Sequence, residues 1–349
     1  MSRKKILIDL YKIKDLYTGL GQFSVNFAQE IAKHQDKDFH FTFLVPSGAT
    51  SLPENVPVVR ANSLRRYFPI LNSGFDVWHS LHQFPSHFPS RSIRQILTIH
   101  DLNFLTEKSP AKAAVYLQRL QRNVERAHCI TTISDYTRHH LLQHIPVSQK
   151  VSVVHNGVAL PEVAPQKLAG IEGKFFFSLS VFKKAKNFEV LIPLMKFFPA
   201  YRLIIAGNHQ TAYGAEIKKM IQEEGLENQV LLPGTVSDAE KLWLYQNCAA
   251  FLFPSLAEGF GLPVIEAMMC GKPVVLSRCT CLPEIGGNVA FYFDDFAVEN
   301  MAKTIENVLR AYEARSEILS EQIADYAKRY SWKECIKGYL LIYDGICKF

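Results

Sequence analysis

The sequence predicts an α/β protein of two domains, each made of a parallel sheet covered by helices. Three observations carry this prediction. The chain has 349 residues, which is more than one ordinary core accommodates. Short apolar runs alternate with amphipathic segments along its whole length, as they do in βαβ units. The alternation is interrupted once, over residues 160–173, where prolines and glycines replace any sustained pattern.

This interruption sets the predicted domain boundaries. We expect an N-terminal domain over residues 1–165 and a C-terminal domain over residues 166–330. The last part of the chain, 331–349, contains an amphipathic segment from Trp332 to Tyr343 that predicts a final helix. Periodicity alone does not say on which domain this helix packs.

Each predicted domain has its own succession of strands and helices. In the first domain, buried strands are expected at 6–9, 41–45, 77–80, 96–99, 129–133 and 151–154, and helices at 23–33 and 113–126. In the second domain, strands are expected at 175–180, 202–206, 230–232, 250–254 and 273–277, and helices at 187–195, 213–224, 238–246 and 263–270.

The composition is that of a globular protein, with 48% hydrophobic and 21% charged residues. No stretch approaches the roughly 18 apolar residues of a membrane-spanning helix. The apolar run within residues 1–9 is too short for a signal peptide, so it is interpreted as the first strand of a cytoplasmic protein.

No metal site is predicted. The seven cysteines form no paired CxxC, and their odd number does not suggest a disulfide framework. Cys279 and Cys281 are interpreted as buried thiols in a loop. Three histidines, His79, His82 and His87, lie close together on a predicted loop, but their spacing is a weak metal signal. We interpret them as acceptor-site or structural residues.

Positive charge is concentrated in the first domain. Residues 1–165 carry 19 Lys and Arg against 12 Asp and Glu, whereas the rest of the chain is nearly balanced. Such asymmetry favours an anionic partner for this domain, such as a phospholipid surface or a pyrophosphate-linked acceptor. An ordinary solvated basic face is the alternative.

The strongest signal for chemistry lies in residues 253–271. A predicted strand runs into a glycine-containing turn, and a helix is expected to begin at Pro263 and to close at Gly271. Gly259 and Gly261 allow the backbone to approach a ligand closely. Exposed N–H groups at the start of a helix attract phosphate.

Two carboxylates flank this turn. Glu258 precedes it and Glu266 lies one turn into the helix, so both can face the same crevice. Because carboxylates repel phosphate, we assign them to hydroxyl groups of a sugar or a ribose. Taken singly, each residue would be better explained as an ordinary turn or surface position, but the whole arrangement favours a ligand site.

With this segment in place, the sequence resembles the retaining glycosyltransferases of family 4 (glycosyl transferases group 1), which have the GT-B fold. Glu258 and Glu266 match the family's E-x7-E signature. Other segments agree in order and spacing: the glycine loop at 18–23, the histidine segment at 98–102, the SxxT and NGV stretches at 134–137 and 154–158, the lysine at 186–187, and the segment at 282–284.

The resemblance covers nearly the whole chain and implies its architecture. Two Rossmann-like domains would present their parallel sheets to each other across a cleft. The N-terminal domain would bind the acceptor, and the C-terminal domain would bind the nucleotide sugar. The helix at 331–349 would pack back on the N-terminal domain.

The resemblance also implies roles for residues of the second domain. Glu266 would bind the ribose hydroxyls, and Glu258 would contact the transferred sugar. Backbone groups near the base and the diphosphate would contribute the remaining donor contacts, at Val236, Gly259, Phe260, Gly261 and Leu262. Because the base is met through backbone groups, the sequence does not separate uracil from guanine.

Lys186 would neutralise the diphosphate and stabilise it as a leaving group. Here the sequence departs from the family pattern, in which an arginine shortly precedes this lysine. Lys183 and Lys184 offer a second cation, although lysine lacks the bidentate fork of arginine. The sequence does not decide which of the two reaches the phosphates.

The first domain contributes His100, which follows an apolar strand at the end where open α/β sheets bind ligands. The resemblance places this histidine against the donor sugar or the acceptor, and it is counted with Lys186 and Glu258 as catalytic. Gly19 and Gly21 would bring the first loop close to the donor phosphate or the acceptor.

The resemblance implies a front-face mechanism, in which the leaving diphosphate itself takes the acceptor proton. Glu258 and Glu266 are therefore not interpreted as the two carboxylates of a retaining hydrolase. Lysines and a helix terminus would replace a metal ion, so no metal or other cofactor is expected. The donor would be a nucleotide sugar such as GDP-mannose or a UDP-sugar.

The predicted function is a hexosyltransferase that moves mannose or glucose to a glycan or lipid-linked acceptor in cell-envelope polysaccharide synthesis, such as that of lipopolysaccharide. The alternatives are a non-catalytic glycan- or nucleotide-binding subunit and a nucleotide-sugar epimerase or phosphorylase of the same fold. A subunit without catalysis is expected to lack Glu258, Lys186 or His100, and all three are present. A dehydrogenase is disfavoured because no G-x-G-x-x-G follows the first strand.

Membrane contact is a further expectation, whereas no nucleic-acid partner is expected. Four cations fall on one face of the helix predicted at 113–126 and its surroundings, opposite an apolar stripe, and residues 65–70 mix cations with aromatics. These features suggest a peripheral enzyme at the inner face of the cytoplasmic membrane. An ordinary basic helix is an equally good interpretation. The cations are Lys112, Arg119, Arg122 and Arg126.

Overall fold

The computed structural model describes residues 3–14, 19–36, 38–49 and 52–347, and it divides into two compact units. Unit 1 combines the chain up to Gly157 with the segment from Tyr330 onward, and unit 2 extends from Val158 to Arg329. The division precedes the boundary predicted at residue 165. Residues 159–173 form no helix or strand, and the N–H of Gln166 donates to the carbonyl of Ala239, which ties this linker to unit 2.

Unit 1 is built on a parallel sheet of seven described strands. Their spatial order is β3-β2-β1-β4-β5-β6-β7. The strands are β1 Lys4–Asp9, β2 Phe39–Val45, β3 Val58–Arg60, β4 Val77–Ser80, β5 Arg94–Ile99, β6 Cys129–Thr132 and β7 Val151–Val153.

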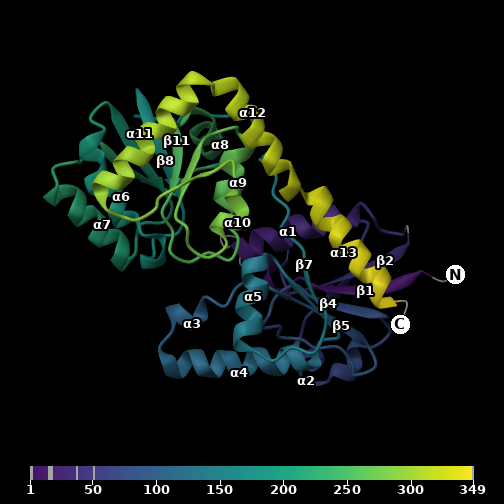
Figure 1. The fold of residues 1–349 in the computed structure, drawn as a ribbon. Helices are drawn as coiled ribbons and strands as arrows, with labels where there is room; N and C mark the ends of the chain where they lie inside the picture. The colour runs from purple at the N-terminus through teal and green to yellow at the C-terminus, as the bar shows by residue number, and fades with distance from the viewer. Residues whose placement is uncertain (1–2, 15–18, 37, 50–51, 348–349) are drawn as a thin grey trace. The chain divides into compact units, whose positions relative to one another are not determined.

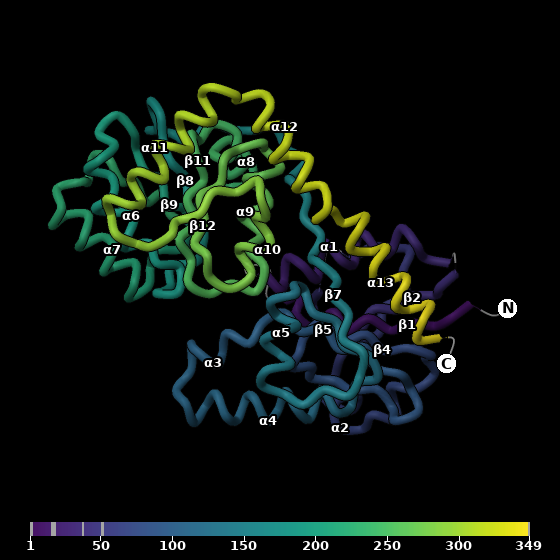
Figure 2. Tube along the Cα trace, in the orientation of Figure 1, coloured from purple at the N-terminus to yellow at the C-terminus, as the bar shows by residue number. Residues whose placement is uncertain are grey.

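Unit 2 repeats the same pattern with six described strands, again all parallel. Their order is β10-β9-β8-β11-β12-β13. The strands are β8 Lys174–Leu179, β9 Tyr201–Ala206, β10 Val230–Gly234, β11 Ala250–Phe253, β12 Val274–Leu276 and β13 Phe291–Tyr292. Figures 1 and 2 show the strands of each unit enclosed by helices. The prediction of two Rossmann-like parallel-sheet domains is confirmed.

Strand order reverses once in each sheet. In unit 1 the chain builds outward from β1 through β2 to β3 and then returns to the other side of β1 with β4. In unit 2 the same reversal lies between β8 and β11. Open α/β sheets bind ligands beyond the carboxyl ends of the strands at such a switch point. Each unit therefore has one edge where a ligand is expected.

The main helices of unit 1 are α1 and α13 on one side of the sheet and α4 and α5 on the other, as their contacts with two separate apolar clusters show. The helices are α1 Gly19–Ala32, α2 Ser63–Tyr67, α3 Phe104–Glu107, α4 Pro110–Arg126, α5 Asp135–His144 and α13 Trp332–Cys347; short 3-10 turns lie at Tyr11–Lys14 (η1) and Pro69–Asn72 (η2).

The C-terminal helix α13, yellow in Figure 1, belongs to the core of unit 1. Trp332 stacks on Phe23 of α1, with ring centroids 5.6 Å apart. Tyr343, fully buried, has its hydroxyl 2.7 Å from Nδ1 of His79 on β4. The end of the chain thus covers one face of the sheet with which the chain begins, and its removal would expose that face.

The helices of unit 2 flank its sheet in the same way. They are α6 Leu191–Leu194, α7 Ala212–Glu223, α8 Asp238–Asn247, α9 Leu262–Met269, α10 Leu282–Gly286, α11 Val298–Ala314 and α12 Ser316–Ala327, with 3-10 turns at Lys184–Lys186 (η3), Phe188–Val190 (η4), Met195–Phe197 (η5) and Lys328–Tyr330 (η6). No helix in the described part of the chain is long and apolar enough to cross a bilayer.

Two predictions of local structure were wrong. The segment 187–195 is not one helix, because Asn187 adopts a left-handed conformation with φ of 55° and separates η3 from η4. Gly19 and Gly21 lie in the first turn of α1 rather than in a loop. Thr18, the first residue of the predicted glycine loop, lies outside the described residues.

Candidate functional site

The turn between β11 and α9 has the geometry of an anion-binding helix start. Gly261 is the N-cap of α9 and has a φ of 97°, a conformation that side chains disfavour. Pro263 is the second rather than the first helical residue, and Gly271 closes the helix. Because the N-cap glycine has no side chain to accept from the first turn of α9, the N-terminal end of this helix can attract an anionic ligand.

Lys186 and Glu258 form an ion pair beside this turn. The ammonium Nζ of Lys186 lies 2.6 Å from Oε1 of Glu258, and each side chain is only 13% exposed. The pair joins the loop after β8 to the loop after β11, which are the two strands at the switch point of unit 2. A cation and a carboxylate are thus held together where a ligand is expected.

The loop carrying Glu258 is fixed by a residue that the sequence did not single out. The N–H of Glu258 donates to Oγ1 of Thr280 over 3.1 Å. Thr280 itself has a φ of 52°, which is a strained conformation for a β-branched residue. Its place two residues before Leu282, where the 282–284 motif begins, was the signal that it belongs to the site.

Glu266 lies in a partly buried polar cluster. Its Oε2 accepts a hydrogen bond of 2.8 Å from the hydroxyl of Tyr245, and its Oε1 lies 3.5 Å from Nζ of Lys241. Lys241 also pairs with Asp238 at 3.1 Å. Burial raises the pKa of Glu266, and the Lys241 ammonium and the Tyr245 hydroxyl oppose that rise. Lys241 and Tyr245 were missed because only the fold brings α8 beside α9.

The two lysines before Lys186 have different surroundings. Lys184 pairs with Glu216 of α7 and lies over the ring of Tyr213, 5.2 Å from its centroid. Lys183 is exposed and immediately precedes η3. The structure therefore directs Lys184 toward α7, away from the ion pair that Lys186 makes.

Val236 lies in the loop that joins β10 to α8 and is partly exposed. Ser237 caps α8 in a reciprocal pair with Glu240, which fixes the start of the helix. Gly234, with a φ of 83°, turns the chain out of β10. The loop therefore lies at the carboxyl end of its strand, and its contact with a base stays a prediction.

His100 lies at the carboxyl end of β5 and is buried. Its Nε2 lies 2.8 Å from the carbonyl of Leu81, so this nitrogen carries the proton. Its backbone N–H donates to Oε1 of Gln83, and its carbonyl accepts from Thr137. Burial lowers the pKa of His100 to about 4, so the ring is neutral at physiological pH.

The three clustered histidines have separate roles. His79 is a core residue, bonded to Tyr343 and to Oγ1 of Thr98. His87 contacts the carbonyl of Asn62. His82 alone lines a hollow at the switch point of unit 1. Among the described residues, no group of three or more His, Cys, Asp or Glu side chains is arranged to hold a metal ion.

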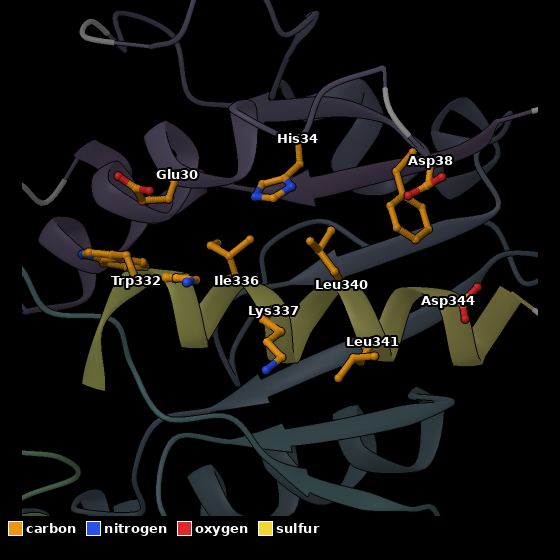
Figure 3. A pocket seen from close by; sticks show the side chains of 11 residues that line it. Glu30, His34, Asp38, Trp332, Ile336, Lys337, Leu340, Leu341 and Asp344 are labelled. Carbon is orange, nitrogen blue, oxygen red and sulfur yellow. The ribbon is translucent and has the colours of Figure 1, made fainter. Parts of the chain in front are cut away.

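A groove of about 540 Å³ lies between α1 and α13 in unit 1 (Figure 3). Ile336 and Leu340 form its apolar floor, and Glu30 of α1 and His34, which follows α1, lie opposite them. Its residues lie on the helical layer and not at the carboxyl ends of the strands. None of the sequence-predicted site residues lines it.

Comparison with known families divides the chain into two matching parts. Residues 19–161 match the model of Glycosyltransferase Family 4, and residues 162–329 match the model of Glycosyl transferases group 1. The two matches meet within the irregular segment that follows β7. Together, the two matches include all the candidate residues described above.

Several curated relatives of similar sequence are mannosyltransferases. The chain is 27% identical over 329 residues to the serotype-specific mannosyltransferase WbdA of Escherichia coli, covering 85% of this chain but only 40% of that protein. It is 26% identical to the O-antigen chain mannosyltransferase B of E. coli, covering 95% and 97% of the two chains. It is 25% identical to the GDP-mannose:cellobiosyl-diphosphopolyprenol alpha-mannosyltransferase of Xanthomonas campestris, over 70% and 66%.

Among solved structures, the fold resembles that of a sucrose-phosphate synthase from Thermosynechococcus elongatus. The TM-score is 0.77 at 18% sequence identity, and the match covers 99% of both chains. At this identity the likeness establishes the GT-B fold and leaves the chemistry to be argued from the site.

Proposed function

The chain belongs to the family 4 glycosyltransferases (glycosyl transferases group 1), and from this membership we propose that it moves a hexose from a nucleotide-diphosphate sugar to a glycan or lipid-linked acceptor. The single observation that supports this most is the Lys186–Glu258 pair beside the Gly261 helix start. It combines a cation for a diphosphate, a carboxylate for a sugar hydroxyl and the N-terminal end of a helix within one short loop cluster.

In the proposed reaction, the bond between the sugar C1 and the diphosphate oxygen breaks with retention of configuration. The acceptor oxygen forms its bond to C1 on the same face, and the acceptor proton passes to the leaving diphosphate. Negative charge grows on that diphosphate as the bond breaks, so a preorganised cation lowers the barrier. Lys186 supplies this cation, and the start of α9 supplies N–H donors.

Glu258 has two tasks in this scheme. In the free protein it holds the Lys186 ammonium at 2.6 Å, which prevents the side chain from sampling other rotamers. With donor bound, it accepts a hydrogen bond from a hydroxyl of the transferred sugar while the diphosphate neutralises Lys186. Glu266 binds the ribose hydroxyls, positioned by Tyr245 and Lys241.

We propose that mannose is the transferred sugar and GDP-mannose the donor. The mannosyltransferases among the relatives support mannose as the transferred sugar. The relative whose name includes GDP-mannose supports guanine as the base of the donor. The chain spans about 40% of the length of the first of these relatives, so its whole reaction need not match theirs. The reaction requires no metal ion in this scheme, since Lys186 and the helix start carry the compensating charge.

The test is a thermal-shift panel of GDP, UDP and ADP with the corresponding mannose and glucose donors. A bound ligand stabilises the fold by about 2.7 kcal/mol at 100 times its dissociation constant, so the cognate nucleotide gives the largest shift. The same panel is repeated with EDTA. No shift with any nucleotide contradicts the proposed function, whereas a shift that EDTA abolishes contradicts the metal-independent mechanism.

We further propose that unit 1 rests on an anionic membrane surface. Residues 64–71 expose Leu64, Tyr67, Phe68, Ile70 and Leu71, each between 47% and 71% exposed. The buried Asn72 fixes this turn by donating to the carbonyls of Arg65 and Phe88. Arg126 of α4 lies 4.3 Å above the ring of Phe88, so the cationic face of α4 adjoins the apolar turn. Proteins that bind the membrane surface typically insert apolar side chains into the lipid interface, with basic side chains nearby that contact anionic headgroups.

Sedimentation with phosphatidylglycerol-containing vesicles tests this contact. We expect binding at low salt, weakened by high salt, and lost in the triple variant Tyr67→Ser, Phe68→Ser, Ile70→Ser. Leu341→Ser is the matched control, because Leu341 is equally exposed on α13 of the same unit. Equal binding by the triple variant would mean that another surface contacts lipid.

A further inference from the structure

A second candidate site lies in unit 1, in a small hollow at its switch point. The hollow is bounded by Asp9, the last residue of β1, and by the residues that follow β4. Asp9 and Ser80 are paired across these two adjacent strands. The hollow thus lies beyond the carboxyl ends of the strands, where a doubly wound sheet binds ligands.

Asp9 is a buried carboxylate with an incomplete set of partners. Its side chain is 7% exposed, and its Oδ1 accepts a hydrogen bond of 3.0 Å from the N–H of Tyr11. No described residue donates a hydrogen bond to its other oxygen, Oδ2. Burial raises the pKa of Asp9 to about 7, against the effect of the Lys12 ammonium. This oxygen is therefore available to accept a hydrogen bond from a ligand in the hollow.

His82 contributes the complementary group. Its Nδ1 accepts a hydrogen bond of 3.1 Å from the N–H of Phe84, so the proton is on Nε2. Burial, together with the nearby His100 and Lys12, lowers the pKa of His82 to about 3 and keeps the ring neutral. Among the polar residues that line the hollow, which also include Lys12 and Ser86, Asp9 supplies an acceptor and His82 a fixed donor.

The size and chemistry of the hollow select its ligand. Its volume of about 10 Å³ admits one water-sized group, so a sugar ring cannot enter but one of its hydroxyls can. A hydroxyl donates one hydrogen bond and accepts others, which matches Asp9 and His82 together. Tyr11 and Phe84 flank the polar groups with aromatic surface, as in many sites that bind small polar molecules.

We propose that the Asp9–His82 hollow binds a hydroxyl of the acceptor saccharide and thereby selects the acceptor. This assignment rests on the glycosyltransferase activity proposed above. The hydroxyl donates to Oδ2 of Asp9 and accepts from Nε2 of His82. Asp9 is a binding residue here and takes no proton from the reacting hydroxyl, since the diphosphate fulfils that role in the proposed mechanism.

The experiment compares wild type with Asp9→Asn in transfer to a panel of octyl mannosides, glucosides and galactosides. Asparagine keeps an acceptor for the Tyr11 N–H but replaces Oδ2 with an amide NH2 group, which donates and cannot accept from the hydroxyl. We expect the KM for the acceptor to rise at least about tenfold, because a hydrogen bond to a charged group is lost. The saturated rate and the nucleotide affinity stay within about twofold. His82→Gln, which can still accept from Phe84, raises the same KM.

Glu54→Gln is the matched control, because Glu54 is an exposed carboxylate of the same unit. An unchanged acceptor KM in Asp9→Asn, or a wild type that binds donor but none of the glycosides, overturns the inference while the proposed function stands. A wild type that binds no nucleotide sugar overturns the proposed function and this inference with it.

Discussion

At the scale of single residues, the Lys186–Glu258 pair decides whether the site is catalytic. Its two members are 13% exposed, so the ammonium is partly desolvated and its charge is weakly screened. We predict that Lys186→Met lowers the transfer rate by about 100-fold or more, as loss of one transition-state contact typically does. Nucleotide-sugar turnover under saturating acceptor is the measurement.

Lys184→Met is the control for this prediction. Lys184 carries the same charge two residues earlier, but it pairs with Glu216. Its rate should stay close to that of wild type, and a thermal melt should show that both variants are folded. If Lys186→Met transfers sugar at the native rate, the diphosphate does not depend on this ammonium.

Lys241 is predicted to act through Glu266. Without the ammonium 3.5 Å away, the pKa of the buried Glu266 rises further, so its ionised form appears only at higher pH. In Lys241→Met we expect nucleoside diphosphate affinity to fall several-fold at neutral pH and to recover as pH rises. Titration calorimetry across pH measures this affinity. Lys219→Met is the control, because Lys219 is an exposed lysine of α7. A pH profile identical to wild type would rule out the coupling.

Single residues of the site were largely predictable, whereas their partnerships were not. Glu258, Glu266 and Lys186 stand out because of their spacing around a glycine turn and because of the resemblance. The contact of Lys186 with Glu258 spans 72 positions and exists because β8 and β11 are neighbours in the sheet. Asp9 was not predicted as a site residue, because one carboxylate ending an apolar strand has no distinguishing pattern.

At the scale of elements, the start of α9 depends on Gly261. Its φ of 97° disfavours any side chain, and a Cβ would lie 3.2 Å from Cδ2 of Leu282. We predict that Gly261→Ala costs about 1–2 kcal/mol of unfolding free energy and weakens nucleotide-sugar binding by distorting the donor turn. Chemical denaturation and calorimetry provide the two values.

Gly225→Ala separates strain from site geometry in this test. Gly225 has a φ of 66° after α7, and a Cβ there would meet open space. Its variant should lose comparable stability and keep native nucleotide affinity. If Gly261→Ala binds the nucleotide sugar as tightly as Gly225→Ala does, the α9 turn does not hold the donor.

The strands were the most predictable elements, for a physical reason. Strands of a parallel sheet covered on both faces are continuous apolar runs, and all the runs predicted in this way are strands. The missed strands, β3 and β13, lie at sheet edges and have only three and two residues. The segment 187–195 has helical periodicity, but its left-handed Asn187 and its Pro193 prevent a continuous helix.

At the scale of the whole molecule, the two units share a topology but differ in their buried titratable groups. Unit 1 buries His79, His82 and His100, whose pKa values are lowered to about 3, 3 and 4. It also buries Asp9, whose pKa is raised to about 7. Unit 2 buries Glu266, whose pKa is raised. Acidification should therefore affect the two units in opposite directions.

The sign follows from proton uptake by each state. Below pH 6.5 the unfolded chain protonates the three histidines while folded unit 1 does not, which costs about 2 kcal/mol per histidine between pH 7 and pH 5. Asp9 opposes this, because folded unit 1 takes up its proton near pH 7 and the unfolded chain does so only near 3.8, a gain of about 2 kcal/mol. The free energy of unfolding of unit 1 should therefore fall by a net of about 3 to 4 kcal/mol between pH 7 and pH 5. Protonation of Glu266 has the opposite sign and stabilises unit 2.

Hydrogen exchange at pH 7 and pH 5, corrected for the intrinsic exchange rate, resolves the units separately. We expect the amides of β1, β4 and β5 to lose protection at pH 5 while those of β8 and β11 keep theirs. His79 adjoins Tyr343 of α13, so the peptides of that helix should lose protection together with β4. Equal loss in both units, or earlier loss in unit 2, would show that the buried histidines do not control the acid stability of unit 1.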